Sequence, residues 1–438
     1  MKPERIAIIG TGYVGLVTGA CFASLGHRVV CYDTDKKKIL DLRKGKMPFF
    51  EPGLKELIQR MTRKGTLHFS LDLDQTVQRS RVIFITVGTP SRQDGSVDLS
   101  YVKAATADVA RYLRGGEIIV SKSTVPVGAS HLVRRIVKKH FKGNFSVISN
   151  PEFLREGVAI STFLKQDRVI IGYEPETSLQ VKRVIRSLYR PLHAPLIETN
   201  NRTAELIKYA ANVFLASEIS FINSIARLCE EIGADVELVS EALKADPRIG
   251  KKAFLSAGIG YGGLCFPKDI RALIRISRRI GYRFEFLDVV ERVNKEQRKV
   301  FVDKMRRLLG TLKGKRVALL GLAFKPDTDD MRDAPSVDII RRLLRAGARV
   351  HVTDPVALSV GRRIFGMSIR YSRSPYDALR GAQIAGFVTE WPVYRTLDFS
   401  RVKKIMSSAK IVDGRNMFDP EKMRKSGFAY QAIGRGGD

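Results

Sequence analysis

The chain has 438 residues, more than one ordinary hydrophobic core accommodates, so we expect two or three domains. Hydrophobic residues make up 44% of it, as in globular proteins, and its four cysteines show neither a CxxC pair nor metal-ligand spacing, which excludes a disulfide framework and a zinc site. The formal net charge of +31 is unusual, but the basic residues form no long run, which excludes a polybasic tail. Such an excess of charge attracts polyanions or steers anionic substrates.

The first strand and helix carry a nucleotide-binding motif. Residues Arg5 to Ile9 form an apolar run, a helical stretch to Leu25 follows, and a second strand at Arg28–Tyr32 ends at Asp33. Between the first strand and the helix stand the glycines of the motif GTGYVG, and glycines there admit a pyrophosphate to the helix N-terminus. The acid after the second strand accepts hydrogen bonds from the adenosine ribose. Because Asp33 repels a 2′-phosphate, we expect NAD rather than NADP. The motif GTGYVG comprises Gly10, Gly12, Tyr13, Val14 and Gly15.

The stretch from Ile6 to Leu25 has no charged side chain and is long enough to span a bilayer. The same strand, glycine turn and helix explain all its features, so we expect no membrane span. A reducing cytoplasm fits the cysteine usage.

Further strands are predicted at Val82–Thr86, Glu117–Ser121 and Ser146–Ser149, leading into the segments GTP, STVPVG and NPEFLREG. Residues just beyond the carboxyl ends of parallel strands line the ligand crevice of an open sheet. Thr124, Glu152 and Glu156 are therefore placed where chemistry is possible. Alternatively, Thr124 is a turn hydroxyl and the two glutamates complement a helix dipole.

Residues 201–245 show helical spacing and no strand signal, and Asn201–Ile232 is predicted to be one long helix. Lys208 and Asn212 are four residues apart and share a face of it. Within 201–250 acidic residues outnumber basic ones, in contrast to the rest of the chain, and we interpret this segment as a dimer surface.

The glycine-rich stretch from Gly258 to Asp269 reads GIGYGGLCFPKD. Glycine serves where the backbone turns sharply or approaches a ligand closely. Pro267 predicts a helix start, so Cys265 lies near a helix N-terminus, a position that favours a thiolate. The alternative is that Cys265 is a small buried hydrophobe.

Beyond it, helices are predicted at Ile270–Gly281 and Phe286–Leu309. Strands at Arg316–Leu320 and Arg349–Thr353 flank a helix at Ser336–Ala346, which indicates a second doubly wound half without the glycine motif. The fold class is thus α/β, with two Rossmann-like doubly wound domains joined by a central helical region. The expected domains are 1–200 (NAD-binding), 201–312 (helical) and 313–438 (Rossmann-like).

Six motifs, in order, resemble those of the nucleotide-sugar 6-dehydrogenases of the UDP-glucose/GDP-mannose dehydrogenase family. They are GTGYVG with Asp33, STVPVG, NPEFLREG, the Lys208/Asn212 helix, GIGYGGLCFPKD and AFKPDTDDMRDAP. The resemblance covers essentially the whole chain. It implies that 201–312 serves dimerisation and carries the catalytic Lys, Asn and Cys, and that 313–438 binds the UDP-sugar. Leu264 departs from the pattern, because the family usually has serine before the cysteine.

By this resemblance Cys265 is the nucleophile, Lys208 and Asn212 support it, and Asp269 with Thr124 holds the water that takes the first proton. Glu152, with Glu156 near it, serves the final hydrolysis. The implied cofactor contacts add Lys38, Thr89, Thr124, Lys268 and Arg332 to the glycine motif and Asp33. The implied substrate contacts are Glu152, Phe153, Leu154, Arg155, Glu156, Lys208, Asn212, Arg248, Phe254, Leu255, Ser256, Ala257, Gly258, Gly262, Lys325 and Arg415, with Arg248 reaching the substrate of a neighbouring subunit.

The resemblance implies NAD-dependent, four-electron oxidation of UDP-glucose to UDP-glucuronate through a thiohemiacetal and a thioester on Cys265, by a cytoplasmic homodimer that serves polysaccharide biosynthesis. GDP-mannose or another nucleotide sugar is the alternative substrate. A polyanion- or nucleic-acid-binding protein is the alternative of another class, suggested only by the charge and opposed by the absence of basic runs interleaved with aromatic residues. No metal is expected.

Overall fold

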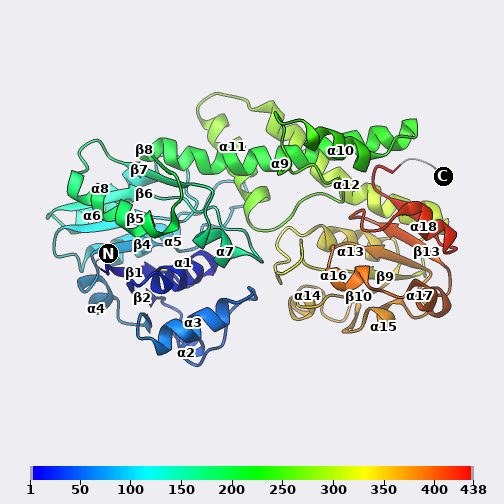
Figure 1. The fold of residues 1–438 in the computed structure, drawn as a ribbon, viewed down its shortest axis with the longest axis horizontal. Helices are drawn as coiled ribbons and strands as arrows, with labels where there is room; N and C mark the ends of the chain where they lie inside the picture. The colour runs from blue at the N-terminus through cyan, green and yellow to red at the C-terminus, as the bar shows by residue number, and fades with distance from the viewer. Residues whose placement is uncertain (1–2, 436–438) are drawn as a thin grey trace. The chain divides into compact units, whose positions relative to one another are not determined.

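The computed structural model describes residues 3–435, and the chain forms two compact units that meet between Ala210 and Ala211 (Figure 1). Each unit is built around one sheet, and we describe each separately. The division into three domains expected above stays a prediction.

The first unit contains an eight-stranded sheet in the order β3-β2-β1-β4-β5-β6-β7-β8. Neighbouring strands are parallel, except that β6 and β7 pair antiparallel. The strands are β1 Arg5–Ile9, β2 Arg28–Tyr32, β3 Leu67–Ser70, β4 Val82–Ile85, β5 Glu117–Ser121, β6 Phe145–Ser149, β7 Val169–Tyr173 and β8 Leu196–Asn200. The helices are α1 Tyr13–Ser24, α2 Lys36–Arg43, α3 Leu54–Arg63, α4 Leu73–Gln78, α5 Ser100–Ala110, α6 Ala129–His140, α7 Ala159–Leu164 and α8 Leu179–Tyr189, with a 3₁₀ turn at Arg190–Leu192.

Both faces of this sheet are buried. Ile6 and Ile8 of β1 pack into one core with α1, whereas Ala7 and Ile9 of the same strand pack into a second core. A strand covered on both faces reads as a continuous apolar run, which is why β1 is apolar almost throughout. In the register, Ile9 lies opposite Tyr32 of β2 and Ile85 of β4, so the loops that follow these strands emerge at one edge.

The second unit has a six-stranded parallel sheet in the order β11-β10-β9-β12-β13-β14. Its strands are β9 Arg316–Leu320, β10 Arg349–Thr353, β11 Arg370–Ser372, β12 Ile384–Phe387, β13 Lys410–Asp413 and β14 Ala429–Ala432. Helix α9 (Asn201–Ile232) begins in the first unit, and the second unit adds α10 Val236–Ala245, α11 Cys265–Arg279, α12 Glu285–Leu309, α13 Pro335–Arg345, α14 Leu358–Phe365, α15 Pro375–Leu379, α16 Pro392–Arg395, α17 Phe399–Ile405 and α18 Pro420–Lys425.

The predicted fold class is confirmed: two parallel-strand α/β sheets are joined through helices. Helix α9 has the predicted bounds, whereas α11 begins at Cys265, earlier than predicted, because Pro267 is tolerated in a first helical turn. The uncharged stretch 6–25 divides between β1 and α1. Among the described residues, no helix is long and apolar enough to cross a bilayer.

In the second unit, the loop after β9 is held by a buried acid. Asp354, after β10, accepts hydrogen bonds from the backbone N–H groups of Leu322 (2.7 Å) and Ala323 (3.2 Å) and from the Trp391 indole (3.1 Å). The acid that corresponds in position to Asp33 is thus used inside the protein.

Candidate active site

The glycine-rich loop before α1 is shaped for close approach. A Cβ on Gly15 would lie 1.9 Å from the carbonyl oxygen of Gly10, so only glycine fits there. In contrast, a Cβ on Gly12 would meet no protein atom within 4 Å. Gly12 also caps α1 without a side-chain hydrogen bond. The open space before Gly12 fits a pyrophosphate at the helix N-terminus.

Asp33 lies at the same edge of the sheet. Its Oδ2 accepts hydrogen bonds from the Thr11 N–H (2.8 Å) and from the Lys38 ammonium (2.9 Å), and its Oδ1 accepts one from the Asp35 N–H (3.0 Å). Burial raises the pKa of Asp33, but these hydrogen bonds outweigh it and hold the pKa below its ordinary value. The carboxylate is therefore ionised and oriented, as a ribose acceptor must be. Lys38, predicted to contact the cofactor, is placed on this acid.

Thr124 follows β5 and lines a small cavity with Lys208. The cavity measures about 10 Å³, close to the smallest space that holds one water molecule. Glu205, one turn before Lys208 on α9, accepts hydrogen bonds from the N–H groups of Gly128 (2.5 Å) and Ser130 (2.9 Å) at the start of α6. It thereby holds α9 against the segment that carries Thr124. The other lining residues are Ser121, Ser123, Val125, Ser149 and Pro151.

Lys208 and Glu152, assigned above to different steps, form an ion pair. The Lys208 Nζ atom lies 3.2 Å from Oε1 of Glu152, and the two side chains are 4% and 6% exposed. The other carboxylate oxygen of Glu152 accepts the Leu154 N–H at 2.6 Å. The ammonium also lies 5.1 Å from the centre of the Phe153 ring. Two charges so deeply buried are tolerated only as partners of each other.

Lys122 is a buried cation that the sequence analysis missed. Its Nζ atom donates to Oδ1 of Asn150 at 2.9 Å and lies over the rings of Phe163 and Tyr189. Burial lowers the pKa of Lys122 to about 8, against the attraction of the Glu152 carboxylate. Its place directly after a parallel strand was the available signal.

Cys265 is the first residue of α11 in the second unit. It is partly exposed, whereas Cys21, Cys31 and Cys229 are buried. Burial raises the pKa of Cys21 to about 12 and raises that of the other two buried thiols, which keeps them protonated. Of the four cysteines, Cys265 alone combines access with a helix N-terminus.

Asp269 lies one turn into α11 and is almost fully buried. Its Oδ2 accepts the Asn212 amide at 2.6 Å, and its Oδ1 accepts the Lys268 ammonium at 2.6 Å. The structure thus brings together three predicted site residues from α9 and α11. Lys268, which the resemblance implies as a cofactor contact, donates to the candidate catalytic residue Asp269.

The glycines before Cys265 permit close packing within the second unit. A Cβ on Gly262 would lie 2.7 Å from the Asp333 carbonyl oxygen, and one on Gly263 would lie 2.9 Å from the Phe324 ring. The Gly263 N–H donates to the Arg332 carbonyl at 2.9 Å. These glycines therefore seat the stretch against loop 321–335, which carries Lys325, instead of merely clearing space for a ligand.

Arg415, after β13, fastens the same region. Its guanidinium donates to the carbonyls of Phe324 (3.0 Å) and Val388 (2.8 Å) and pairs with Glu390 at 3.2 Å. Arg332 forms a two-pronged pair with Asp330, with both distances 2.8 Å. Both arginines have partners in the protein, and whether they also bind ligands stays a prediction.

The remaining predicted residues lie in loops of the two units. Arg248 is exposed and pairs with Asp246 at 2.6 Å. Thr89 lies in the loop after β4, and Phe254 to Gly258 lie in the loop between α10 and α11. Glu156 and Arg155 lie between β6 and α7 in the first unit.

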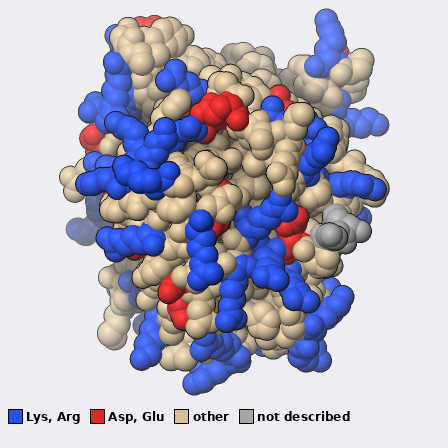
Figure 2. All heavy atoms as spheres, turned by 90° about the vertical axis from the view of Figure 1, so that its left-hand side faces the viewer, with Lys and Arg blue, Asp and Glu red and all other residues tan. Residues whose placement is uncertain are grey.

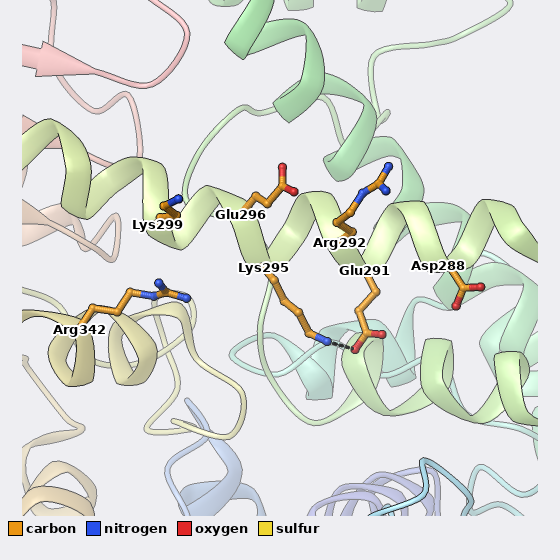
Figure 3. Close-up of a pocket in the computed structure, with 7 residues that line it drawn as sticks. All are labelled: Asp288, Glu291, Arg292, Lys295, Glu296, Lys299 and Arg342. Atoms are coloured by element: carbon orange, nitrogen blue, oxygen red, sulfur yellow. Dashed lines mark ion pairs between the residues drawn. The ribbon is translucent and has the colours of Figure 1, made fainter. Parts of the chain in front are cut away.

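A groove of about 370 Å³ lies along α12 and α13, but none of the predicted site residues lines it. Its lining is charged throughout and of mixed sign. Figure 3 shows Lys295 paired with Glu291 on the side towards Arg342, while Arg292 and Glu296 point the other way. The lining residues are Asp288, Glu291, Arg292, Lys295, Glu296, Lys299 and Arg342.

The excess positive charge is dispersed. Figure 2 shows Lys and Arg side chains spread over one face as separate projections, with acidic side chains between some of them. Several arginines have acidic partners, such as Arg134 with Glu176 at 2.6 Å. Among the described residues, no group of His, Cys, Asp and Glu is arranged to hold a metal ion.

The chain matches three consecutive models of the UDP-glucose/GDP-mannose dehydrogenase family. Residues 4–193 match the NAD binding domain, 202–296 the central domain and 318–420 the UDP binding domain. A UDP-glucose 6-dehydrogenase of Bacillus subtilis is 46% identical over 99% of this chain and 93% of its own length. One of Rhizobium meliloti is 45% identical over 98% and 99% of the two chains.

Solved structures agree with these matches. A UDP-glucose dehydrogenase from the hyperthermophilic archaeon Pyrobaculum islandicum has a TM-score of 0.91 and 40% identity, over 98% of this chain and 97% of its own. A UDP-D-ManNAc dehydrogenase from Pyrococcus horikoshii has a TM-score of 0.87 and 27% identity, over 98% and 99%. The alternative of a polyanion-binding protein receives no support from either comparison.

Proposed function

Because the chain belongs to the UDP-glucose/GDP-mannose dehydrogenase family, we propose that it oxidises UDP-glucose to UDP-glucuronate with two molecules of NAD, through covalent intermediates on Cys265. The observation that carries the choice of substrate is the 46% identity to a UDP-glucose 6-dehydrogenase over 99% of this chain.

The glycine loop and Asp33 are the residues that hold NAD. The open space at Gly12 fits its pyrophosphate, and the ionised Asp33 carboxylate accepts hydrogen bonds from its ribose. NAD, when bound, accepts the hydride of each oxidation. The Lys38 ammonium offsets part of the negative charge of Asp33 and contacts only Oδ2 of that carboxylate, while Oδ1 accepts the Asp35 N–H.

In the first oxidation, the C6 hydroxyl of the sugar loses its proton to a water held by Thr124 and Asp269, and C6 loses a hydride. The water-sized cavity at Thr124 supports this role. Lys208 and Asn212 stabilise the developing oxyanion, a contribution of about 10²–10³ in rate per donor in measured cases.

The resulting aldehyde is captured by Cys265. The sulfur of Cys265 adds to C6 to give a thiohemiacetal, and loss of its hydroxyl proton and a second hydride converts this into a thioester. A free aldehyde would be hydrated or lost between the two oxidations. The accessible position of Cys265 at the start of α11 supports its role as the nucleophile.

Hydrolysis completes the reaction. Glu152, with Glu156 near it, accepts a proton from a water whose oxygen attacks the thioester carbon; the carbon–sulfur bond breaks and Cys265 leaves as a thiolate. The Lys208 ammonium, 3.2 Å from Oε1 of Glu152, helps to orient this side chain.

We further propose that the enzyme is a homodimer joined along α9. Phe214, Phe221 and Leu228 are 62%, 52% and 54% exposed and recur every seven residues, so they lie along one face of the helix. Exposed apolar stripes of this kind are unusual in monomers. The segment 201–250 is also the part of a strongly basic chain in which acidic residues predominate, so two copies meet there with least repulsion. Arg248, exposed at its edge, then serves the neighbouring subunit.

The three-domain division at 200/201 and 312/313 belongs to the same proposal, as does a cytoplasmic location, which the four free cysteines support. The product is an activated sugar acid suited to polysaccharide biosynthesis.

Substrate choice is tested by mixing the purified protein with NAD and, separately, UDP-glucose, GDP-mannose and UDP-N-acetylmannosamine, and following NADH. We expect kcat/KM for UDP-glucose to exceed the others at least about a hundredfold, an amount that a few unpaired polar contacts produce. Preference for another sugar would contradict the assignment.

A further inference from the structure

Glu51 is a buried carboxylate to which the proposed mechanism gives no role. It lies in the loop between α2 and α3 and is 6% exposed. Its Oε2 accepts hydrogen bonds from the Tyr13 hydroxyl at 2.6 Å and from the Gly157 N–H at 2.7 Å. Its Oε1 accepts the Ala159 N–H at 2.7 Å. Three donors thus converge on one side chain.

Only a carboxylate satisfies these donors. Glutamine has the same shape but one acceptor oxygen, and its NH₂ group would face a backbone N–H of Gly157 or Ala159. An unsatisfied buried N–H costs about 1–3 kcal/mol. These three hydrogen bonds fix the Glu51 side chain between the two segments, and we call this arrangement the Glu51 bracket.

The segments that Glu51 joins are two parts of the proposed site. Tyr13 belongs to the glycine motif at the start of α1, and Gly157 and Ala159 end the loop that carries Glu152. Helix α1 also packs against both α3 and α7. Burial and the Glu51 carboxylate raise the pKa of Tyr13, with smaller contributions from the charges of Glu156 and Glu152, so the phenol keeps its proton and donates a hydrogen bond to Glu51.

The Glu152 loop has an anchor at each end. At its start, Asn150 accepts the Lys122 ammonium at 2.9 Å. At its end, Gly157 has a φ of +83°, which glycine adopts without strain, and its N–H is held by Glu51. Glu152 lies between these anchors, so its direction towards Lys208 depends on both.

We propose that Glu51 is a positioning residue for thioester hydrolysis: by bracketing the end of loop 150–158 to the glycine motif, it holds Glu152 where the attacking water must be activated. The inference rests on the proposed function. Thr124, Asn212 and Cys265, proposed for the hydride steps, lie on other elements. Lys208 pairs with Glu152 and the glycine motif contacts Glu51 through Tyr13, so oxidation is slowed as well, but by less. Loss of the bracket therefore slows hydrolysis more than oxidation, because a shift of about 1 Å in a catalytic group costs up to about a hundredfold in rate.

The test compares Glu51→Gln with wild type by rapid mixing with UDP-glucose at saturating NAD. Wild type is expected to show little accumulated intermediate. In the variant we expect a burst of two NADH per site at a rate within about threefold of wild type, followed by turnover slowed at least about tenfold. Mass spectrometry of the acid-quenched protein should then find the sugar acid bound to Cys265 as a thioester.

Glu117→Gln is the matched control. Glu117 is also buried and accepts hydrogen bonds from two backbone N–H groups, those of Arg114 and Gly115, both at 2.8 Å. It is the first residue of β5, whereas Thr124 follows the other end of that strand. We expect Glu117→Gln to lower the stability of the protein about as much as Glu51→Gln does, but to show no burst of NADH. If Glu51→Gln does not fold, Glu51→Asp keeps the charge on a shorter side chain and should accumulate the same thioester to a smaller extent.

In Glu51→Gln, equal slowing of oxidation and hydrolysis or an unchanged turnover would overturn the proposal. A thioester that accumulates in Glu117→Gln would do the same. Where Glu51→Asp replaces a Glu51→Gln variant that does not fold, the lack of any accumulated thioester in Glu51→Asp would also overturn it. Failure of the proposed function is visible separately, because wild type itself would then release no NADH with UDP-glucose.

Discussion

The Nζ atom of Lys208 lies 3.2 Å from Oε1 of Glu152, so a buried ion pair joins α9 to the loop after β6. One member is proposed to stabilise an oxyanion and the other to activate water. Their contact makes the two roles interdependent, because removing either charge exposes the other to an apolar surrounding. The pair also orients Glu152 before substrate is present.

We expect Glu152→Gln and Lys208→Met each to lower the free energy of unfolding by about 3 kcal/mol, the usual cost of breaking a buried pair. The double variant should regain most of that loss while remaining inactive. Denaturant unfolding followed by circular dichroism measures both effects.

The control for this cycle is Arg186→Met, which breaks the more exposed pair of Arg186 with Glu198. Its cost should be much smaller than that of Glu152→Gln or Lys208→Met, because solvent screens an exposed pair. Additive losses in the Lys208/Glu152 double variant would show that the two charges do not stabilise each other.

Lys122 predicts a pH dependence of stability. Its pKa falls from an ordinary value of 10.5 to about 8 because the ammonium is buried. Between these values the unfolded chain binds a proton that the folded protein has released, so this lysine makes stability rise as pH increases from about 8 to 10.5. Below about pH 8 its full cost, about 3 kcal/mol, is present.

In Lys122→Met this rise should disappear, and the variant should be at least as stable as wild type at pH 7. Asn150 keeps a donor there, since the Tyr189 hydroxyl also donates to its Oδ1. Lys139→Met, which removes an exposed lysine, should keep the wild-type slope. If the free energy of unfolding changed with pH in the same way in wild type and in Lys122→Met, burial of the Lys122 ammonium would not lower the stability of the protein.

The glycine loop offers a matched pair of substitutions. A Cβ at Gly15 would lie 1.9 Å from a backbone oxygen, whereas one at Gly12 would meet nothing within 4 Å. Gly15→Ala should therefore lower stability by about 1–3 kcal/mol or more. Gly12→Ala should fold normally but bind NAD at least about tenfold more weakly, because its methyl group enters the space proposed for the pyrophosphate. Isothermal titration with NAD measures the effect of Gly12→Ala, and thermal unfolding measures that of Gly15→Ala. A normal NAD affinity in Gly12→Ala would show that the pyrophosphate does not bind in the space at Gly12.

The dimer proposal predicts that Phe221→Ser combined with Leu228→Ser yields monomers. Sedimentation equilibrium should show half the wild-type mass, with a folded circular dichroism spectrum. Leu179→Ser, at a comparably exposed leucine at the start of α8, should leave the mass unchanged. A wild-type mass in the double variant would place the interface elsewhere.

Much of the fold was predictable because its signals are local. The glycine motif, the acid at the end of β2 and the helical spacing of α9 each depend on a few neighbouring residues. The family motifs then led to an assignment of the side chains that carry chemistry, and that assignment stays a prediction. Lys268 shows the limit of this reasoning: implied as a cofactor contact, it forms an ion pair with the neighbouring Asp269.

Contacts between distant segments could not be predicted in the same way. Glu51 lies more than a hundred residues from the backbone groups that it binds, and nothing around it distinguishes a bracket from a surface acid. The burial of Lys122 likewise depends on Tyr189 and Phe163 from elements far along the chain. Such roles follow from packing, which one sequence does not display.

The central claim is a four-electron oxidation through a covalent intermediate on Cys265. Its most direct test is to measure NADH and UDP-glucuronate from a known amount of UDP-glucose, with wild type and with Cys265→Ser. We expect two NADH and one UDP-glucuronate per UDP-glucose from wild type, and loss of net UDP-glucuronate formation in the variant, because an oxygen hemiacetal is a poor route to an ester that hydrolyses. Undiminished UDP-glucuronate formation by Cys265→Ser would contradict the covalent mechanism, and one NADH per sugar from wild type would contradict the four-electron reaction.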